Sequence, residues 1–98
     1  MTIGIKENGT DLVLEITGRL DTATAPTLDK AIKEKLENAK SLILDFKGLE
    51  YISSAGLRVI LGAQKAMKQK GTMKVINVRE LVMEVFEVTG FSEILTIE

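Results

Sequence analysis

The sequence contains neither cysteine nor histidine among its 98 residues. Without cysteine the chain has no disulfide, no thiolate nucleophile and no soft metal ligand. Without histidine it lacks the commonest general base near neutral pH. These absences argue against acyl-transfer and hydrolytic chemistry. We therefore expect a protein that is not an enzyme and that needs no cofactor or metal ion.

Long apolar runs and blocks of like charge are also missing. No segment approaches the ~20 apolar residues of a membrane helix, and charges occupy the N-terminus, where a signal peptide would need an apolar run. The 13 basic and 14 acidic residues nearly cancel. The sequence has no basic stripe that could bind the phosphate backbone of a nucleic acid. The sequence predicts a cytoplasmic protein that neither inserts into a membrane nor binds nucleic acid.

What remains is typical of one small globular domain. Apolar residues make up 45% of the chain and charged residues 28%, as in ordinary soluble proteins. No linker or low-complexity stretch divides the chain, so we expect a single domain over residues 1–98.

The N-terminal part predicts a β-hairpin followed by a helix. Met1 to Glu7 and Leu12 to Ile16 alternate apolar and polar residues on either side of Asn8-Gly9, a pair that suits a type I′ turn. Gly18 to Ala23 is predicted to be a loop. Thr24 or a near neighbour then caps an amphipathic helix of about 13 residues.

The rest of the chain alternates predicted strands and helices. A strand is expected at Ser41–Phe46, followed by a loop at Lys47–Ile52 and a helix from Ser53 to Lys70 that ends at a left-handed Gly71. A strand at Met73–Ile76 and a helix around Leu81–Phe86 follow. This helix is expected to end at Gly90, with Phe91 folding back, and a last strand is expected at Ile94–Ile97. The core stripe of the middle helix is predicted to be Leu57, Ile60, Leu61 and Gln64–Met67.

This order predicts an α/β fold with a small mixed, mostly parallel sheet and an N-terminal β-hairpin. Parallel crossovers are right-handed in roughly 98% of cases. If the strands follow one another in sequence order, every crossover helix lies on the same face. The other face then stays partly exposed, which fits the mixed character of Val13, Glu15 and Lys74.

The most informative segment runs from Gly48 to Lys65. Ser53 and Ser54 stand where a loop becomes a helix, and Ala55 and Gly56 follow them. A serine at such a point can cap the first helical turn, which is worth about 1 kcal/mol, and a glycine lets that turn pack closely on the sheet. Judged by spacing alone, capping is the favoured interpretation.

The order of the residues adds a second interpretation. The run Phe46-x-Gly48-Leu49-x-Tyr51-Ile52-Ser53-Ser54-Ala55-Gly56-Leu57 resembles the signature of the STAS domain family. This family includes bacterial anti-sigma-factor antagonists and the cytosolic tails of sulfate transporters. The family's Gly-x-Leu-Asp loop is similar to Gly18-Arg19-Leu20-Asp21, and its C-terminal half is similar to Gly71 with the next strand and to Val85–Phe91. The resemblance spans essentially the whole chain. It implies a STAS-like fold, with helices stacked as a right-handed β-α superhelix.

The resemblance also implies a phosphorylation-gated protein switch. In antagonist members the serine before the Ser/Thr/Ala-Gly-Leu step is phosphorylated by the anti-sigma factor, which is itself a serine kinase; that position here is Ser54. The unphosphorylated antagonist binds the anti-sigma factor and frees a sigma factor, and a serine phosphatase resets the cycle. The family often has Asp before the target serine. Because Ser53 stands there in this sequence, Ser53 is a second candidate for phosphorylation.

A partner surface around Ser54 follows from the same resemblance. Its expected members are Asp21, Thr22, Ser53, Ser54, Ala55, Gly56, Leu57, Arg58 and Leu61. A phosphoserine carries about −1.5 to −2 charge at pH 7. We expect the N–H groups of Gly56 and Leu57 to bind that phosphate at the helix N-terminus, so the domain stays folded while the partner is repelled.

Two alternatives remain open at this point. The chain can be a STAS-like structural or regulatory subunit of a larger assembly such as a transporter, with Ser54 serving only as a cap. It can also be an enzyme or nucleotide-binding protein with the Ser-Ser-Ala-Gly turn as an anion cradle, although that turn lacks the glycines and the lysine of a P-loop and only a lysine of depressed pKa is left to activate a serine.

Two aspartates could be read as a catalytic pair. We expect Asp21 instead to close its own loop through backbone amides, and Asp45 to stabilise the turn after its strand.

Overall fold

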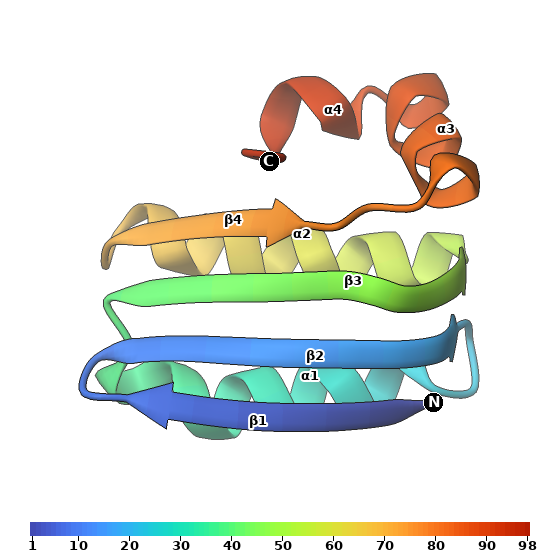
Figure 1. Ribbon diagram of the computed structural model, residues 1–98. Helices are drawn as coiled ribbons and strands as arrows, with labels where there is room; N and C mark the ends of the chain where they lie inside the picture. The colour runs from blue at the N-terminus through green and yellow to red at the C-terminus, as the bar shows by residue number, and fades with distance from the viewer.

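Four strands form one sheet in the computed structural model, which describes residues 1–98. In sequence order, and side by side, they are β1 (Thr2–Asn8), β2 (Asp11–Leu20), β3 (Ser41–Ile52) and β4 (Thr72–Ile76). β1 and β2 pair antiparallel, and the other neighbours pair parallel. Gly9, with a φ of 64°, makes the turn between β1 and β2. The predicted mixed, mostly parallel sheet with its N-terminal hairpin is confirmed (Figure 1).

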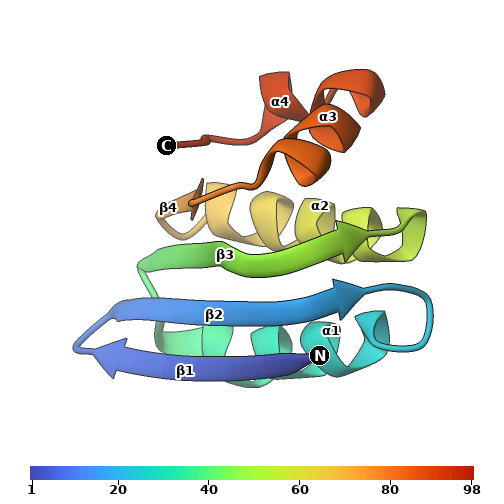
Figure 2. The same cartoon turned by 45° about the vertical axis from the view of Figure 1, so that its right-hand side comes forward.

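The crossover helices lie on one face of this sheet. They are α1 (Ala25–Lys35), which a short 3₁₀ turn η1 (Leu36–Asn38) extends, and α2 (Ser54–Lys68). Figures 1 and 2 show both helices behind the sheet, as the sequential strand order predicts. On the open face Val13, Glu15 and Lys74 are half-buried. Two further helices, α3 (Glu80–Thr89) and α4 (Phe91–Ile94), lie beyond β4.

One hydrophobic cluster lies between the sheet and the helices. It contains 23 buried residues, and no polar or charged residue is buried with them. Alternate residues of β2 and β3 point into it because successive side chains of a strand face opposite sides of the sheet. Leu57, Ile60 and Met67 of α2 are buried as predicted, whereas Leu61 and Gln64 are half-buried and Ala63 takes the core position between them.

β2 and β3 are longer than the sequence predicts. The expected loop Lys47–Ile52 is therefore wrong, because β3 continues to Ile52, and the expected loop Gly18–Ala23 is partly wrong, because β2 continues to Leu20. The two strands pair with each other along these extensions, across two shifts of register. Gly18 permits one shift with a φ of 101°. At Gly48 a Cβ would lie 2.7 Å from the hydroxyl oxygen of Thr17, so the glycine is needed for close strand pairing rather than for a loop.

Gly71 does not have the predicted left-handed conformation. The glycines with positive φ are Gly9, Gly18 and Gly90. α2 ends at Lys68, and Gly71 instead passes so close to the backbone of Lys40 that no side chain would fit. The glycine is required by a close approach of two loops, which the local sequence does not reveal.

The predicted final strand at Ile94–Ile97 is also wrong. Gly90 ends α3 in the left-handed region as predicted, with a φ of 82°, but the chain then forms the helical turn α4. Phe91 folds back on Phe86 with the ring centroids 6.4 Å apart, as predicted. Only one parallel bridge, between Ile97 and Val75, joins the C-terminus to the sheet.

Candidate functional site

The loop after β2 and the turn after β3 meet at one end of the molecule. β2 and β3 are parallel neighbours, so their C-terminal ends lie together, with Leu20 opposite Ile52. The N–H of Ser53 donates to the carbonyl oxygen of Leu20 at 2.9 Å. This hydrogen bond joins the two segments on which the sequence predicts functional residues, at the right-hand side of Figure 1.

The two adjacent serines have different surroundings. Ser53 is the N-cap of α2: its hydroxyl oxygen accepts the N–H of Gly56 at 3.3 Å, and its carbonyl accepts the N–H of Leu57 at 2.9 Å. Ser54 is the first residue of the helix, is exposed, and its hydroxyl makes no hydrogen bond. The capping that spacing predicts is thus performed by Ser53, which leaves the Ser54 hydroxyl accessible to solvent.

The N–H groups expected to receive a phosphate are not the available ones. Because Ser53 already engages the N–H groups of Gly56 and Leu57, that expectation is wrong. The N–H groups of Ser54 and Ala55 have no acceptor in the protein. They stand at the positive end of the α2 dipole, next to the exposed hydroxyl.

Gly56 sets the distance between α2 and the sheet. A Cβ at this position would lie 2.7 Å from Cγ of Leu20 and 2.9 Å from Cγ1 of Ile52. Real Cβ contacts are not that short, so any side chain here would displace the start of the helix. The prediction that this glycine lets the first turn pack closely is confirmed.

The loop before α1 is closed by its own side chains. Oδ1 of Asp21 accepts the N–H of Ala23 at 3.1 Å and the N–H of Thr24 at 3.0 Å, which confirms the predicted Asx-type role. The hydroxyl of Thr24 accepts the N–H of Asp21 at 2.8 Å but makes no capping bond to α1. The Thr24 N–H and hydroxyl, followed by the Ala23 N–H and the charge of Arg19, lower the pKa of Asp21 from its ordinary value of 3.8.

Asp45 also acts on the backbone next to it. Its Oδ1 accepts the N–H of Lys47 at 3.0 Å and the side-chain amide of Asn77 at 3.0 Å. The carboxylate thus stabilises the connection between β4 and α3, although it lies within β3 rather than at its end.

Arg19 and Tyr51 form a contact that the sequence interpretation missed. The guanidinium carbon of Arg19 lies 4.1 Å from the centroid of the Tyr51 ring, within the range of a cation–π interaction. The two residues are opposite each other where β2 and β3 end. The sequence analysis placed both residues in loops, so the strand pairing that brings them together was visible only in the structure.

The other predicted members of the surface differ in exposure. Thr22 and Arg58 are exposed, Asp21, Ser53, Ala55 and Leu61 are half-buried, and Gly56 is buried. The side chain of Leu57 lies in the core, with 7% of the residue exposed. Leu57 therefore anchors the start of α2 in the core, and its side chain is not available for contact with a partner.

The largest hollow of the surface lies elsewhere. It has a volume of about 640 Å³ and opens on the uncovered sheet face, where Asn8, Asp11 and Thr72 mark the end opposite to Ser54. The candidate site is thus an exposed surface rather than a cavity.

No helix is both long and apolar enough to cross a membrane.

Comparisons with known proteins agree with this fold. The STAS domain family model matches residues 2–98. The anti-sigma-B factor antagonist of Bacillus subtilis (strain 168) is 31% identical over 98 residues, which cover 99% of this chain and 90% of that protein. A crystal structure of an anti-sigma factor antagonist from Mycobacterium paratuberculosis superimposes with a TM-score of 0.89 at 20% identity, over 98% of this chain and 83% of that one. The Bacillus cell fate determinant SpoIIAA in its phosphorylated form superimposes with a TM-score of 0.78 at 17% identity, over 99% and 91% of the two chains.

Proposed function

We propose that this chain, which belongs to the STAS domain family, is an anti-sigma-factor antagonist that is switched by phosphorylation of Ser54. Unphosphorylated, it binds an anti-sigma factor that is a serine kinase, and so frees a sigma factor; a serine phosphatase restores the binding form. This role is supported by relatives that are named anti-sigma factor antagonists, a name that describes a regulatory binding protein rather than an enzyme.

The choice of Ser54 rests on the difference between the two serines. The hydroxyl of Ser54 is free of hydrogen bonds on an exposed residue, whereas that of Ser53 accepts the Gly56 N–H on a half-buried residue. Esterifying Ser53 would disturb the helix cap, at a cost of about 1 kcal/mol. Ser54 can accept a phosphoryl group from a bound kinase without losing any contact within the protein.

The fold should tolerate the phosphate, and the complex should not. At the start of α2 the dianion would lie beside the unpaired N–H groups of Ser54 and Ala55, an arrangement that helix N-termini favour by up to ~2 kcal/mol. The same charge, of about −1.5 to −2, would meet a partner surface shaped for a neutral hydroxyl. Since ~1.4 kcal/mol changes an affinity tenfold, a penalty of a few kcal/mol releases a micromolar partner.

The assignment is tested by phosphate transfer. The protein is incubated with ATP and the purified anti-sigma factor of the same organism, and the modified residue is mapped by mass spectrometry. Ser53→Ala should still be phosphorylated, and Ser54→Ala should not. Phosphate found only on Ser53 or on Thr22 would contradict the assignment. Stable binding to the anti-sigma factor with no phosphate transfer would favour the structural-subunit alternative, in which Ser54 has no regulatory role.

A further inference from the structure

One face of α3 is apolar and uncovered. Leu81 is 56% exposed and Val88 87% exposed. With the half-buried Val85 between them they form what we call the α3 patch, a shallow groove of about 270 Å³ that Glu84 and Thr89 complete. Val82 and Phe86 of the same helix are buried in the core, and Val85 packs against that core at the edge of the patch. The fold therefore covers only part of the apolar surface of α3 and leaves Leu81 and Val88 exposed.

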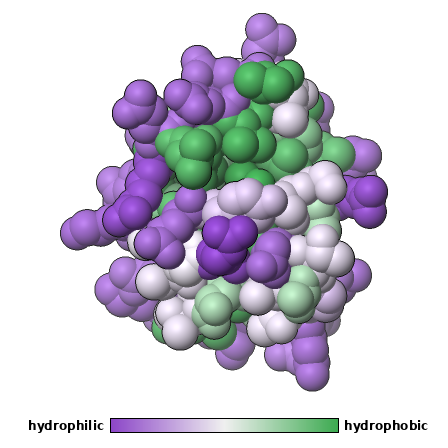
Figure 3. Space-filling model, turned by 90° about the vertical axis from the view of Figure 1, so that its right-hand side faces the viewer, coloured by the Kyte–Doolittle hydropathy of each residue, from purple (hydrophilic) through white to green (hydrophobic).

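The α3 patch lies at the same end of the molecule as Ser54. The side chain of Arg79, which precedes α3, donates to the carbonyl oxygen of Lys47 at 2.9 Å and ties the helix to β3. Figures 1 and 2 show α3 above the turn from β3 into α2. Figure 3 faces this end, and its hydrophobic area adjoins the paler, more polar surface below it. One partner can therefore cover both.

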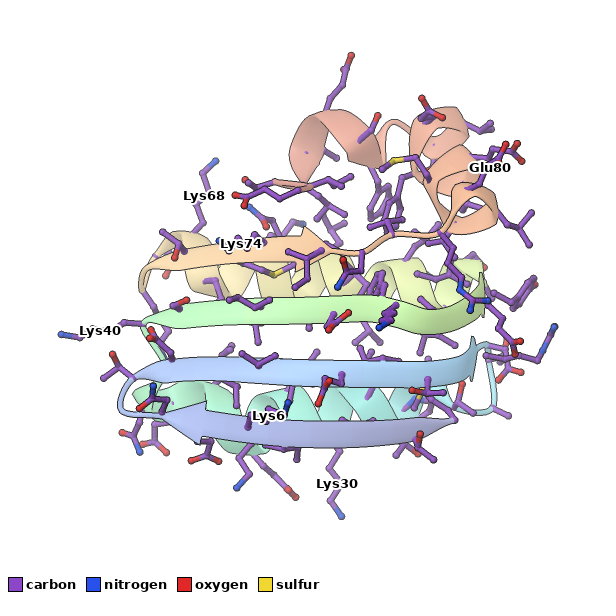
Figure 4. All side chains as sticks on the ribbon, viewed as in Figure 1. Lys6, Lys30, Lys40, Lys68, Lys74 and Glu80 are labelled. Carbon is purple, nitrogen blue, oxygen red and sulfur yellow. The ribbon has the colours of Figure 1, made fainter.

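The charged residues of α3 itself are all glutamates, whereas the exposed Arg79 precedes the helix. Glu80, Glu84 and Glu87 are exposed, and none of them forms an ion pair. Figure 4 shows Glu80 on α3, whereas Lys40 and Lys68 project from the other end of the molecule. An apolar centre with unpaired carboxylates beside it is complementary to apolar side chains flanked by lysine or arginine.

We propose that the α3 patch is a second docking contact for the same anti-sigma factor that meets Ser54. The factor would place apolar side chains over Val88 and Leu81 and basic side chains opposite Glu84. This inference rests on the proposed function and extends its contact area from α2 to α3. The α3 patch would then supply affinity, while Ser54 supplies the switch.

The test compares two substitutions of exposed apolar residues by lysine. Val88→Lys places a charge in the α3 patch, and Ile5→Lys places the same charge on β1, where Ile5 is 43% exposed. Dissociation constants for the purified anti-sigma factor are measured by titration calorimetry, with thermal melts to check folding. Val88→Lys should raise the dissociation constant about tenfold or more, and Ile5→Lys should leave it within about twofold. An unchanged constant for a folded Val88→Lys would overturn the inference.

Two further variants separate this inference from the proposed function. Glu84→Gln should weaken binding at low salt and reduce its dependence on ionic strength, because it removes one of the proposed charge contacts. Ser54→Glu tests the switch alone. If Ser54→Glu releases the anti-sigma factor while Val88→Lys and Glu84→Gln bind like the wild type, the α3 contact is refuted and the proposed function stands. If the wild-type protein does not bind the factor, both are refuted.

Discussion

Ser53 and Ser54 show how two neighbouring identical residues acquire different roles. The backbone of Ser53 is extended, so its hydroxyl can turn back to the Gly56 N–H. Ser54 already has helical geometry, and its side chain projects from the first turn into solvent. The structural cap and the proposed regulatory hydroxyl thus lie on separate residues, and modification of one need not disturb the other.

Replacing Ser54 should separate binding from switching. Ser54→Ala is expected to bind the anti-sigma factor with the wild-type dissociation constant and to stay bound in the presence of ATP. Ser54→Asp should bind at least tenfold more weakly, because a carboxylate imitates part of the phosphate charge. Calorimetric titration of each variant, with and without ATP, measures both effects. Release of Ser54→Ala by ATP would show that another residue is modified.

The carboxylate of Asp21 should make stability depend on pH. Its folded-state pKa is lowered from 3.8, chiefly by the N–H and hydroxyl of Thr24. Because the pKa is lower in the folded state, the ionised carboxylate stabilises the folded protein at every pH above its ordinary pKa. This contribution is lost as the pH falls through the lowered pKa of the folded state. The melting temperature of Asp21→Asn should therefore lie below that of the wild type at pH 7, and the difference should shrink in acid. A difference that is constant between neutral pH and pH 3.8 or below would contradict this role.

At the scale of the element, α2 is the part of the fold that presents the site. Its start is held at one distance from the sheet by Gly56, which contacts Leu20 and Ile52, and at one orientation by the Ser53 N–H bond to Leu20. A second glycine of the same helix, Gly62, has open space around it. The two glycines form a natural pair for testing whether the close approach is required.

Alanine at these two positions should have opposite effects. Gly56→Ala pushes a methyl group against Leu20 and Ile52 and should destabilise the protein by about 1–3 kcal/mol. Gly62→Ala meets no atom and should stabilise it by roughly 0.5–1 kcal/mol, because alanine has the higher helix propensity. Urea denaturation of both variants measures the two free energies. Equal effects of the same sign would show that α2 does not pack on the sheet as described.

At the scale of the whole molecule, one core joins the sheet, the two covering helices and the C-terminal pair of helices. Phe86 of α3 packs between Phe46 of β3 and Phe91 of α4, with ring centroids 6.3 and 6.4 Å away. The N–H of Val75 also donates to the carbonyl of Thr96 at 2.9 Å. The α3 patch is therefore carried by a helix that the core fixes in place.

Removing the Phe86 ring should weaken the entire domain rather than its C-terminus alone. Phe86→Ala is expected to lower the free energy of unfolding by about 3–5 kcal/mol, because a fully buried aromatic side chain is lost from a shared core. Two-state unfolding is common in single domains of this size, so circular dichroism and amide exchange should report one transition. Loss of protection in α3 and α4 while β2 and β3 remain protected would show instead that the C-terminal helices are an independent unit.

The sequence by itself determined the features that depend on neighbouring residues. Alternating apolar residues placed β1 and β2 in a hairpin, the amphipathic pattern after Thr24 placed α1, and Gly90 marked the end of α3. The spacing of Ser53, Ser54 and Gly56 indicated a helix cap, and the resemblance of this run to the STAS signature located the candidate site. These are local preferences, and the tertiary structure did not override them.

Only the tertiary structure decided the features that join distant parts of the chain. β2 and β3 extend beyond their predicted ends because each pairs with the other, and Gly48 and Gly71 are needed because remote backbone or side chains pass close by. The predicted last strand became the helical turn α4, and Ile97 joins the sheet only through a bridge to the distant Val75. The exposure of Val88 beside the Ser54 surface likewise depends on where α3 docks. Such contacts involve partners that are far away in sequence, and no local pattern contains them.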